Sequence, residues 1–173
     1  TVRPALTVSA SIASICMGDS VLLTPVIASP GNGGPYTYSW SNGATTSTTM
    51  VYGTSPVSTN YIVTVSDGCT SPSATATFTV ATNPPPTVNI VADSLVGNAP
   101  LTVNFDDLGV GGTTFNWNFG NGSTSSSQHP NAQTYQTGGT YQVIFTSTSS
   151  TGCIARDTLS ILVIDLVPEI VVP

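Results

Sequence analysis

The sequence predicts an all-β protein made of two tandem antiparallel β-sandwiches. Three observations support this fold class. A Trp, a Tyr and a Gly-Cys pair recur in the same order at near-equal offsets, at positions 40, 61 and 68–69 and again at 117, 141 and 152–153, as expected for two copies of one module. Short alternating segments are separated by turn residues every ~8–12 residues, a spacing typical of sandwiches. No window has a convincing helical period.

The first module, residues 1–82, contains six predicted strands whose limits are set by clusters of Gly, Pro and Asn. We expect these strands at residues 5–13, 21–27, 36–40, 45–52, 60–66 and 74–80. Within residues 61–66, large apolar side chains alternate with smaller or polar ones, so Tyr61, Val63 and Val65 are predicted to face the core. Trp40 is predicted to fill the centre of the sandwich.

A proline-rich joint at residues 83–86 separates this module from the second one, residues 87–165, because consecutive prolines cannot continue a strand ladder. Tyr141, Val143 and Phe145 repeat the alternation, and Trp117 is the second predicted plug. Residues 166–173 form an apolar C-terminal tail. The predicted strands of the second module are residues 87–92, 101–105, 113–119, 133–137, 140–147 and 156–164.

Charged residues make up 6% of the chain, against about 25% in typical soluble domains. The only basic residues are Arg3 and Arg156, and the formal net charge is −6. This composition argues against binding to nucleic acids or anionic membranes, and the absence of Lys excludes a Lys-derived isopeptide cross-link. Either glycans or other subunits cover so weakly charged an exterior, or the mild polar surface is tolerated as it is.

The three cysteines indicate an oxidising compartment. Cys16 and Cys69 are predicted to form a disulfide within the first module, which would stabilise it by roughly 4 kcal/mol on the chain-entropy model. Cys153 would then be left over, as a buried small apolar residue or paired between chains. No apolar run is long enough to span a bilayer. The first residue is not Met, which favours a processed or excised stretch of a longer precursor.

Catalytic and metal sites have weak support in the sequence. His129 is the only His and lies in a polar loop before Pro130, so we expect an exposed loop residue and no hydrolase triad. A glycosidase would need a pair of carboxylates that face each other. Asp106 and Asp107 are adjacent in the sequence, which places them on opposite faces of a strand or in a turn, and Glu169 lies in the tail. The sequence therefore gives such a pair little support. Asn104 with these two aspartates could offer oxygen ligands to calcium, but a solvated turn is the better interpretation. We therefore expect no enzyme activity, metal or cofactor.

Aromatic side chains could bind sugars if they were exposed. Trp40 and Trp117 fit the buried plug better, which leaves Tyr36, Tyr52 and Tyr135 as weak candidates.

Residues 87–164 resemble a PKD domain, an Ig-like sandwich. The resemblance rests on the motif Trp117-Asn-Phe-Gly-Asn-Gly-Ser123, on Gln133-Thr-Tyr135 and on Gly139-Thr-Tyr-Gln-Val143. Asn121 stands where the family usually has Asp, and both residues suit the turn. The motif is informative about fold and nearly silent about ligands.

Residues 14–80 resemble the Ig-like repeats of surface proteins from Bacteroidota, on the strength of residues 16–21, 38–43 and 59–69. The tail resembles the lead-in to a type IX secretion sorting domain. Ser20, Ser94 and Thr158 lie in short Asp-Ser/Thr-apolar motifs that resemble the O-glycosylation signal of the same bacteria. These resemblances imply a secreted, extracellular or cell-surface protein.

Two functions remain as expectations. The first is a structural or adhesive surface protein, whose partners are copies of itself or other surface proteins and which assembles into a filament. In that case the terminal segments, through Val2, Leu6, Ile170, Val171 and Val172, would add strands to a neighbour's sheet. The second is a carbohydrate-binding or spacer module of a secreted polysaccharide-degrading enzyme.

Overall fold

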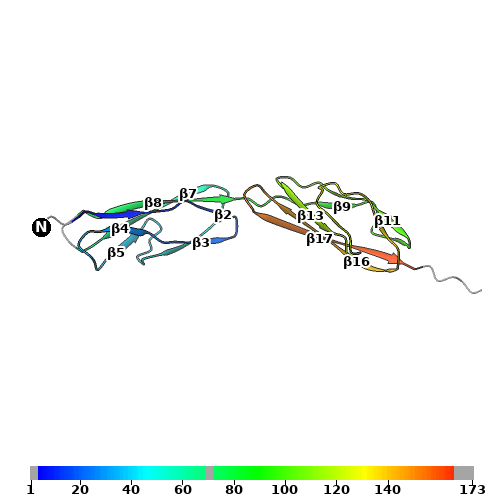
Figure 1. Cartoon of the computed structure of the whole chain (residues 1–173), viewed down its shortest axis with the longest axis horizontal. Coiled ribbons are helices and arrows are strands. Elements are labelled where there is room, and N and C mark those ends of the chain that lie inside the picture. The colour runs from blue at the N-terminus through cyan, green and yellow to red at the C-terminus, as the bar shows by residue number, and fades with distance from the viewer. Residues whose placement is uncertain (1–3, 69–71, 166–173) are drawn as a thin grey trace, which may run out of the picture. The chain divides into compact units, whose positions relative to one another are not determined.

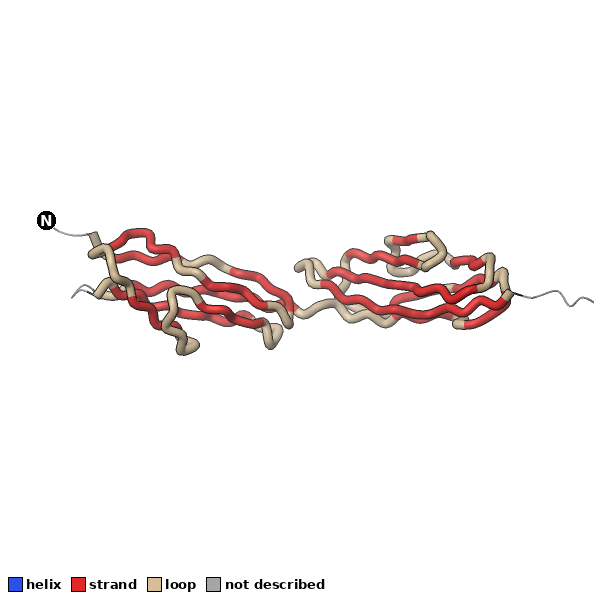
Figure 2. Tube along the Cα trace, turned by 90° about the horizontal axis from the view of Figure 1, so that it is seen from below, coloured by secondary structure: helices blue, strands red, loops and turns tan. Residues whose placement is uncertain are grey.

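A computed structural model describes residues 4–68 and 72–165 of the chain, and these residues form strands and no helix (Figures 1 and 2). No helix in this part of the chain could therefore cross a membrane. The all-β prediction is confirmed. The chain divides into two compact units, Thr1–Pro84 and Pro85–Pro173, and the boundary falls inside the predicted joint. Asn83, assigned to that joint from the sequence, is the last residue of a strand.

The first unit has a four-stranded sheet in the order β2-β8-β7-β5 and two strand pairs, β1–β4 and β3–β6, that form the opposing layer. Its strands are β1 (Leu6–Ser9), β2 (Ala13–Cys16), β3 (Ser20–Leu23), β4 (Val26–Pro30), β5 (Thr37–Trp40), β6 (Thr49–Tyr52), β7 (Ser58–Ser66) and β8 (Ala74–Asn83).

The second unit has a five-stranded sheet in the order β10-β17-β16-β13-β14 and two opposing pairs, β12–β9 and β11–β15. Its strands are β9 (Ile90–Ala92), β10 (Val96–Asn98), β11 (Leu101–Val103), β12 (Phe105–Asp107), β13 (Thr114–Asn118), β14 (Thr124–Ser125), β15 (Gln133–Tyr135), β16 (Gly139–Thr148) and β17 (Ile154–Ile164).

The two units have the same strand pairing, so the repeat in the sequence corresponds to a repeat in the structure. Each pair in the first unit has a counterpart in the second: β1–β4 matches β9–β12, β2–β8 matches β10–β17, β3–β6 matches β11–β15, β5–β7 matches β13–β16, and β7–β8 matches β16–β17. Among the described residues, the difference is β14, which pairs with β13 and has no equivalent beside β5.

The prediction of purely antiparallel sandwiches needs one correction. β2 pairs in parallel with β8, and β10 pairs in parallel with β17. In each unit the first stretch of strand pairs within one layer, and the chain then moves to the edge of the other layer, where it runs alongside the last strand. The sequence predicted this stretch of the first unit, residues 5–13, as a single strand, whereas the structure has two short strands, β1 and β2.

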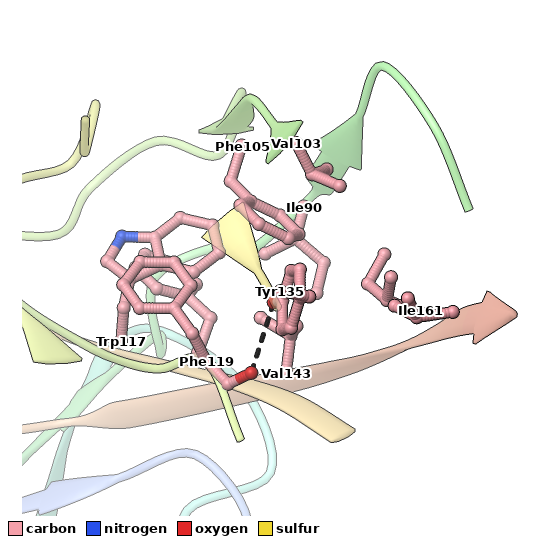
Figure 3. Packing of buried hydrophobic residues seen from close by; sticks show 10 residues of the cluster. Ile90, Val103, Phe105, Trp117, Phe119, Tyr135, Val143 and Ile161 are labelled. Carbon is pink, nitrogen blue, oxygen red and sulfur yellow. Dashed lines mark hydrogen bonds between the residues drawn. The ribbon is translucent and has the colours of Figure 1, made fainter. Parts of the chain in front are cut away.

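The two cores lie between the layers of each sandwich, and the predicted alternation is confirmed. Val63, Val65, Val143 and Phe145 are fully buried. Side chains from β9, β11, β12 and β15 pack against those from the five-stranded sheet, as Figure 3 shows for Ile90, Val103, Phe105, Trp117, Phe119, Tyr135, Val143 and Ile161.

Both tryptophans are the buried plugs that the sequence predicted. Trp40 is 3% exposed and Trp117 is fully buried. The indole N–H of Trp40 donates a hydrogen bond to the Thr46 carbonyl at 2.9 Å, and that of Trp117 donates to the Ser127 carbonyl at 2.9 Å. Each ring therefore has both its apolar body and its polar group satisfied inside its own unit.

Candidate functional site

A shallow depression of about 380 Å³ lies over the β9–β12 pair in the second unit. It forms where outward side chains of two short antiparallel strands meet, since Val91 pairs with Asp106 in the register. Its lining residues are Val91, Ala92, Asp93, Asn104, Phe105 and Asp106.

One rim of the depression is an Asp–Asn pair. Asp93 follows β9, and Asn104 is the single residue between β11 and β12. The Asn104 side-chain amide donates to Asp93 Oδ2 at 2.6 Å, and its backbone N–H donates to Oδ1 at 3.0 Å. These two hydrogen bonds, the side-chain one first, hold the pKa of Asp93 below its usual value, because they favour the charged carboxylate.

Asp106, which also lines the depression, forms an exposed pair with His129. The Asp106 carboxylate contacts His129 Nδ1, and the two side chains are 41% and 68% exposed. The prediction of an exposed loop His is confirmed. No Ser or Thr hydroxyl is hydrogen-bonded to this imidazole among residues 4–68 and 72–165. The depression is thus lined by two carboxylates and an amide, with the His129 imidazole beside Asp106, and these groups suit hydrogen bonding to a polar ligand.

Asp107 points the other way, as expected for neighbours in a strand. It is 1% exposed, and its Oδ1 accepts backbone N–H groups from Asn89 and Gly109, each at 2.9 Å. Gln128 Nε2 lies 3.4 Å from Oδ2. This carboxylate ties the start of the unit and a loop to β12, so its role is structural. The described part of the chain has no group of three His, Cys, Asp or Glu side chains that could hold a metal ion.

The tyrosine candidates for sugar stacking differ in exposure. Tyr52 is 64% exposed, and Tyr36 is half-buried with its hydroxyl donating to the Pro30 carbonyl at 2.9 Å. The prediction for Tyr135 is wrong, because this side chain is fully buried and its hydroxyl donates to the Phe119 carbonyl at 3.1 Å (Figure 3). Burial, with a smaller contribution from Tyr141, raises the pKa of Tyr135 to about 12.

The first unit has an exposed apolar surface that was not predicted from the sequence. Leu22, Met50 and Tyr52 lie on the outward face of the β3–β6 pair, where Leu22 and Met50 are directly opposite each other. Their exposed fractions are 52%, 47% and 64%. We call these three residues the β3–β6 patch. The alternation of exposed and buried positions in each strand is a signal for it, but only once the register between the strands is known.

Cys16 is the last residue of β2 and pairs in register with Asn83, the last residue of β8. Cys69 lies outside the described residues, so the Cys16–Cys69 disulfide stays a prediction.

Cys16 and Cys153 are both disulfide-bonded in the structure. Cys153 is fully buried, as the sequence suggested, but the prediction that it is a leftover thiol is wrong. Its environment is the tight turn between β16 and β17, where its N–H donates to Ser149 Oγ at 3.1 Å.

The candidate glycosylation and strand-exchange residues have mixed positions. Ser20 and Thr158 are exposed, whereas Ser94 is half-buried and its hydroxyl donates to the Val96 carbonyl at 2.9 Å. Leu6 lies in β1 and is 6% exposed, because its side chain packs in the core of its own unit. The prediction that Leu6 takes part in strand exchange with a neighbour is therefore wrong. The remaining exchange candidates lie outside the described residues: Val2, Ile170, Val171 and Val172.

The two-layer packing, the buried Trp and the repeated strand order define both units as β-sandwiches of the immunoglobulin-like class. Residues 83–163 match the family model of the PKD domain, and this part of the chain is a PKD domain. PKD domains are typically extracellular and non-catalytic, and the disulfide-bonded cysteines are consistent with such a location.

Similar solved structures include PKD domains from bacteria and human. The PKD1 domain of the Vibrio cholerae metalloprotease PrtV is 26% identical, with 45% of this chain and 95% of that one covered and a TM-score of 0.39. The PKD1 domain of Vibrio anguillarum Epp is 26% identical, with 47% and 95% covered and a TM-score of 0.40. The PKD domain of human KIAA0319 is 24% identical, with 47% and 84% covered and a TM-score of 0.39. A comparison with curated protein sequences finds no match.

Proposed function

We propose that this chain is part of a secreted or cell-surface protein whose two sandwiches serve a structural or adhesive role. The observation that carries this proposal is the use of its chemically versatile side chains. Trp40, Trp117, Tyr135 and Asp107 are buried and hydrogen-bonded within the fold. Side chains that are buried and hydrogen-bonded in this way stabilise the module and are not accessible to a substrate or ligand.

The finer form of the proposal is self-assembly into a filament through the C-terminal segment. Residues 166–173 contain five Leu, Ile or Val residues and one charged residue, Glu169. An apolar segment of this kind gains main-chain hydrogen bonds and buries its side chains when it joins a sheet edge. Because donor and acceptor lie on different parts of the chain, such contacts propagate without closing.

Negative-stain electron microscopy of the concentrated full chain tests self-assembly. The matched variant replaces Ile170, Val171 and Val172 with Ser, outside the described fold. We expect linear particles for the unmodified chain and dispersed particles for the variant. Dispersed particles for both proteins at every concentration would contradict self-assembly.

A surface location with O-glycans at Ser20, Ser94 and Thr158 is a further part of the proposal. It is supported by the exposure of Ser20 and Thr158 and by the scarcity of charge, since glycans would help solubility. Intact-mass analysis of native material should show added hexose, and an unmodified mass would remove this part. The half-buried Ser94 should be the least modified of the three.

Carbohydrate binding is the second candidate, and the rim of the β9–β12 depression favours it. Carboxylate, amide and imidazole groups around a small apolar floor match the hydroxyl pattern of a sugar. A glycan array should then show binding that decreases when Asp106 and His129 are replaced by Ala, or when Tyr52 is replaced on the other unit. An array without signal would leave only a spacer role.

A further inference from the structure

The internal duplication of the chain gives a direct comparison for the β3–β6 patch. The equivalent pair in the second unit is β11–β15, in which Thr102 is directly opposite Thr134. Their hydroxyls are 2.9 Å apart, and both residues are exposed. At the same step of the ladder the first unit has Leu22 opposite Met50.

The alignment of the two pairs follows from their buried positions. Leu23 and Val103 are the last residues of β3 and β11, and they are 2% and 0% exposed. Counting back one residue gives Leu22 and Thr102. On the partner strands, Tyr52 corresponds to Gln136, which is exposed and directly follows β15.

The same fold therefore accepts Thr, Thr and Gln where the first unit has Leu, Met and Tyr. Exposed apolar side chains at these positions are not required by the sandwich. In a chain with so few charges, a continuous apolar strip is best explained as an interface that is covered in the assembled protein.

β6, which carries Met50 and Tyr52, also has a free edge in the described part of the chain. In the described part of the chain, β6 pairs with β3 on one side, and no other backbone hydrogen bond involves residues 49–52. The patch thus lies beside a row of main-chain N–H and C=O groups that can accept another strand.

The C-terminal segment matches this edge in length and chemistry. Pro168 and Pro173 enclose a run of four residues, 169–172, and β6 is also four residues long. Proline is tolerated at the ends of an edge strand but not within it. In an extended run, Ile170 and Val172 lie on one face, where they can pack beside the apolar side chains of β6.

We propose that the β3–β6 patch and the free edge of β6 form the acceptor site for residues 166–173 of a second copy of this chain. The inference rests on the proposed self-assembly and adds the place where it occurs. Each copy then carries one donor in its tail and one acceptor in its first unit, so that copies join head to tail. The patch is buried by apolar side chains, and β6 gains a second row of main-chain hydrogen bonds.

Two variants of the full chain separate donor from acceptor. The acceptor variant imports the residues of the second unit, Leu22→Thr, Met50→Thr and Tyr52→Gln, which this fold already accommodates. The donor variant is Ile170→Ser, Val171→Ser and Val172→Ser. Ile62→Thr is the control, because Ile62 is 46% exposed on the other sheet of the same unit. Circular dichroism and thermal unfolding verify that all variants are folded.

Sedimentation velocity over a wide concentration range measures assembly. We expect the unmodified chain and Ile62→Thr to form oligomers that grow with concentration, and each of the two triple variants to remain monomeric. An equimolar mixture of the two variants should stop at a heterodimer, because it retains one intact tail and one intact patch. Hydrogen exchange should show slower exchange of the β6 amides in the unmodified oligomer.

The results for the two variants distinguish failure of the proposed acceptor site from failure of the proposed self-assembly. If the donor variant is monomeric while the acceptor variant assembles like the unmodified chain, the acceptor lies elsewhere and only the inference is overturned. If the acceptor variant is monomeric but the donor variant assembles, the patch binds a different part of the second copy. If the tail binds its own patch, β6 protection is independent of concentration. A monomeric unmodified chain overturns both proposals.

Discussion

Asp106 and Asp107 show how strand geometry gives two neighbouring carboxylates different roles. Asp106 faces solvent beside His129, whereas Asp107 is buried and accepts two backbone N–H groups. A buried carboxylate is tolerated when hydrogen bonds replace its water. The pair is therefore a matched test of burial, because both positions are in the same strand.

Replacing Asp107 with Ala should lower the free energy of unfolding by roughly 2–4 kcal/mol, since the N–H groups of Asn89 and Gly109 lose their acceptor. Asp106→Ala should change it by no more than about 0.5 kcal/mol. Urea denaturation of the two variants measures both values. Equal effects would show that Asp107 does not hold the loop.

Tyr135 makes the free energy of unfolding depend on pH in the alkaline range. Because burial raises its pKa from 10.0 to about 12, the unfolded state loses the phenol proton first as the pH rises. Its contribution is complete below pH 10 and is lost between pH 10 and pH 12, by roughly 2–3 kcal/mol in total.

Tyr135→Phe should cost about 1 kcal/mol at pH 7 through the lost hydrogen bond to Phe119 and should weaken the decline in stability above pH 10. Tyr52→Phe, on an exposed tyrosine, is the control and should keep the decline of the unmodified protein. Denaturant unfolding at pH 7 and pH 11 measures the difference. An unchanged decline in Tyr135→Phe would contradict the assignment.

The cysteines offer a direct chemical test. Alkylation of the denatured, unreduced protein should leave Cys16 and Cys153 unmodified, because both are in disulfide bonds, and both should react after reduction. Peptide mass spectrometry reads each site separately. Alkylation of Cys153 before reduction would favour the pairing that the sequence suggested.

At the scale of the strands and turns, the loop after β13 illustrates why glycine is needed at one position more than at another. Gly120 has φ of +75°, and a Cβ there would lie 2.7 Å from the Gln142 carbonyl oxygen of β16. Gly122 has φ of +91° but no atom within 4 Å of such a Cβ. Both positions are strained for other residues, but only Gly120 also packs against a strand.

Gly122→Ala should therefore destabilise the protein by about 1–2 kcal/mol, the usual cost of the left-handed conformation. Gly120→Ala should cost about 2–5 kcal/mol, because overpacking adds to that strain. Thermal and urea unfolding compare the two. Equal losses would indicate that the turn moves away from β16 without penalty.

Alternation along single strands was enough to predict the cores, as the burial of Val63, Val65, Val143 and Phe145 shows. It could not predict pairing between distant segments. The parallel β2–β8 pair and the contiguity of Leu22 with Met50 both depend on register, which is a tertiary property. Tyr135 was misplaced for the same reason, since a strand of three residues does not reveal which face is buried.

At the scale of the whole molecule, the two copies of one sandwich have diverged on their surfaces while keeping the same strand pairing. The second unit covers the edge of its large sheet with β14 and has a Thr–Thr pair on its small sheet. Among the described residues of the first unit, no such strand pairs with the corresponding edge of β5, and this unit has the apolar β3–β6 patch. Under the proposed self-assembly, the first unit is therefore the one that accepts a second copy of the chain.

The mass of the full chain in solution tests the structural account most directly. Light scattering after size-exclusion chromatography should give a mass that rises above the 17.6 kDa of one chain as the concentration increases, and the tail variant at Ile170, Val171 and Val172 should remain at the mass of one chain. A single species of one-chain mass for the unmodified protein at all concentrations would contradict self-assembly.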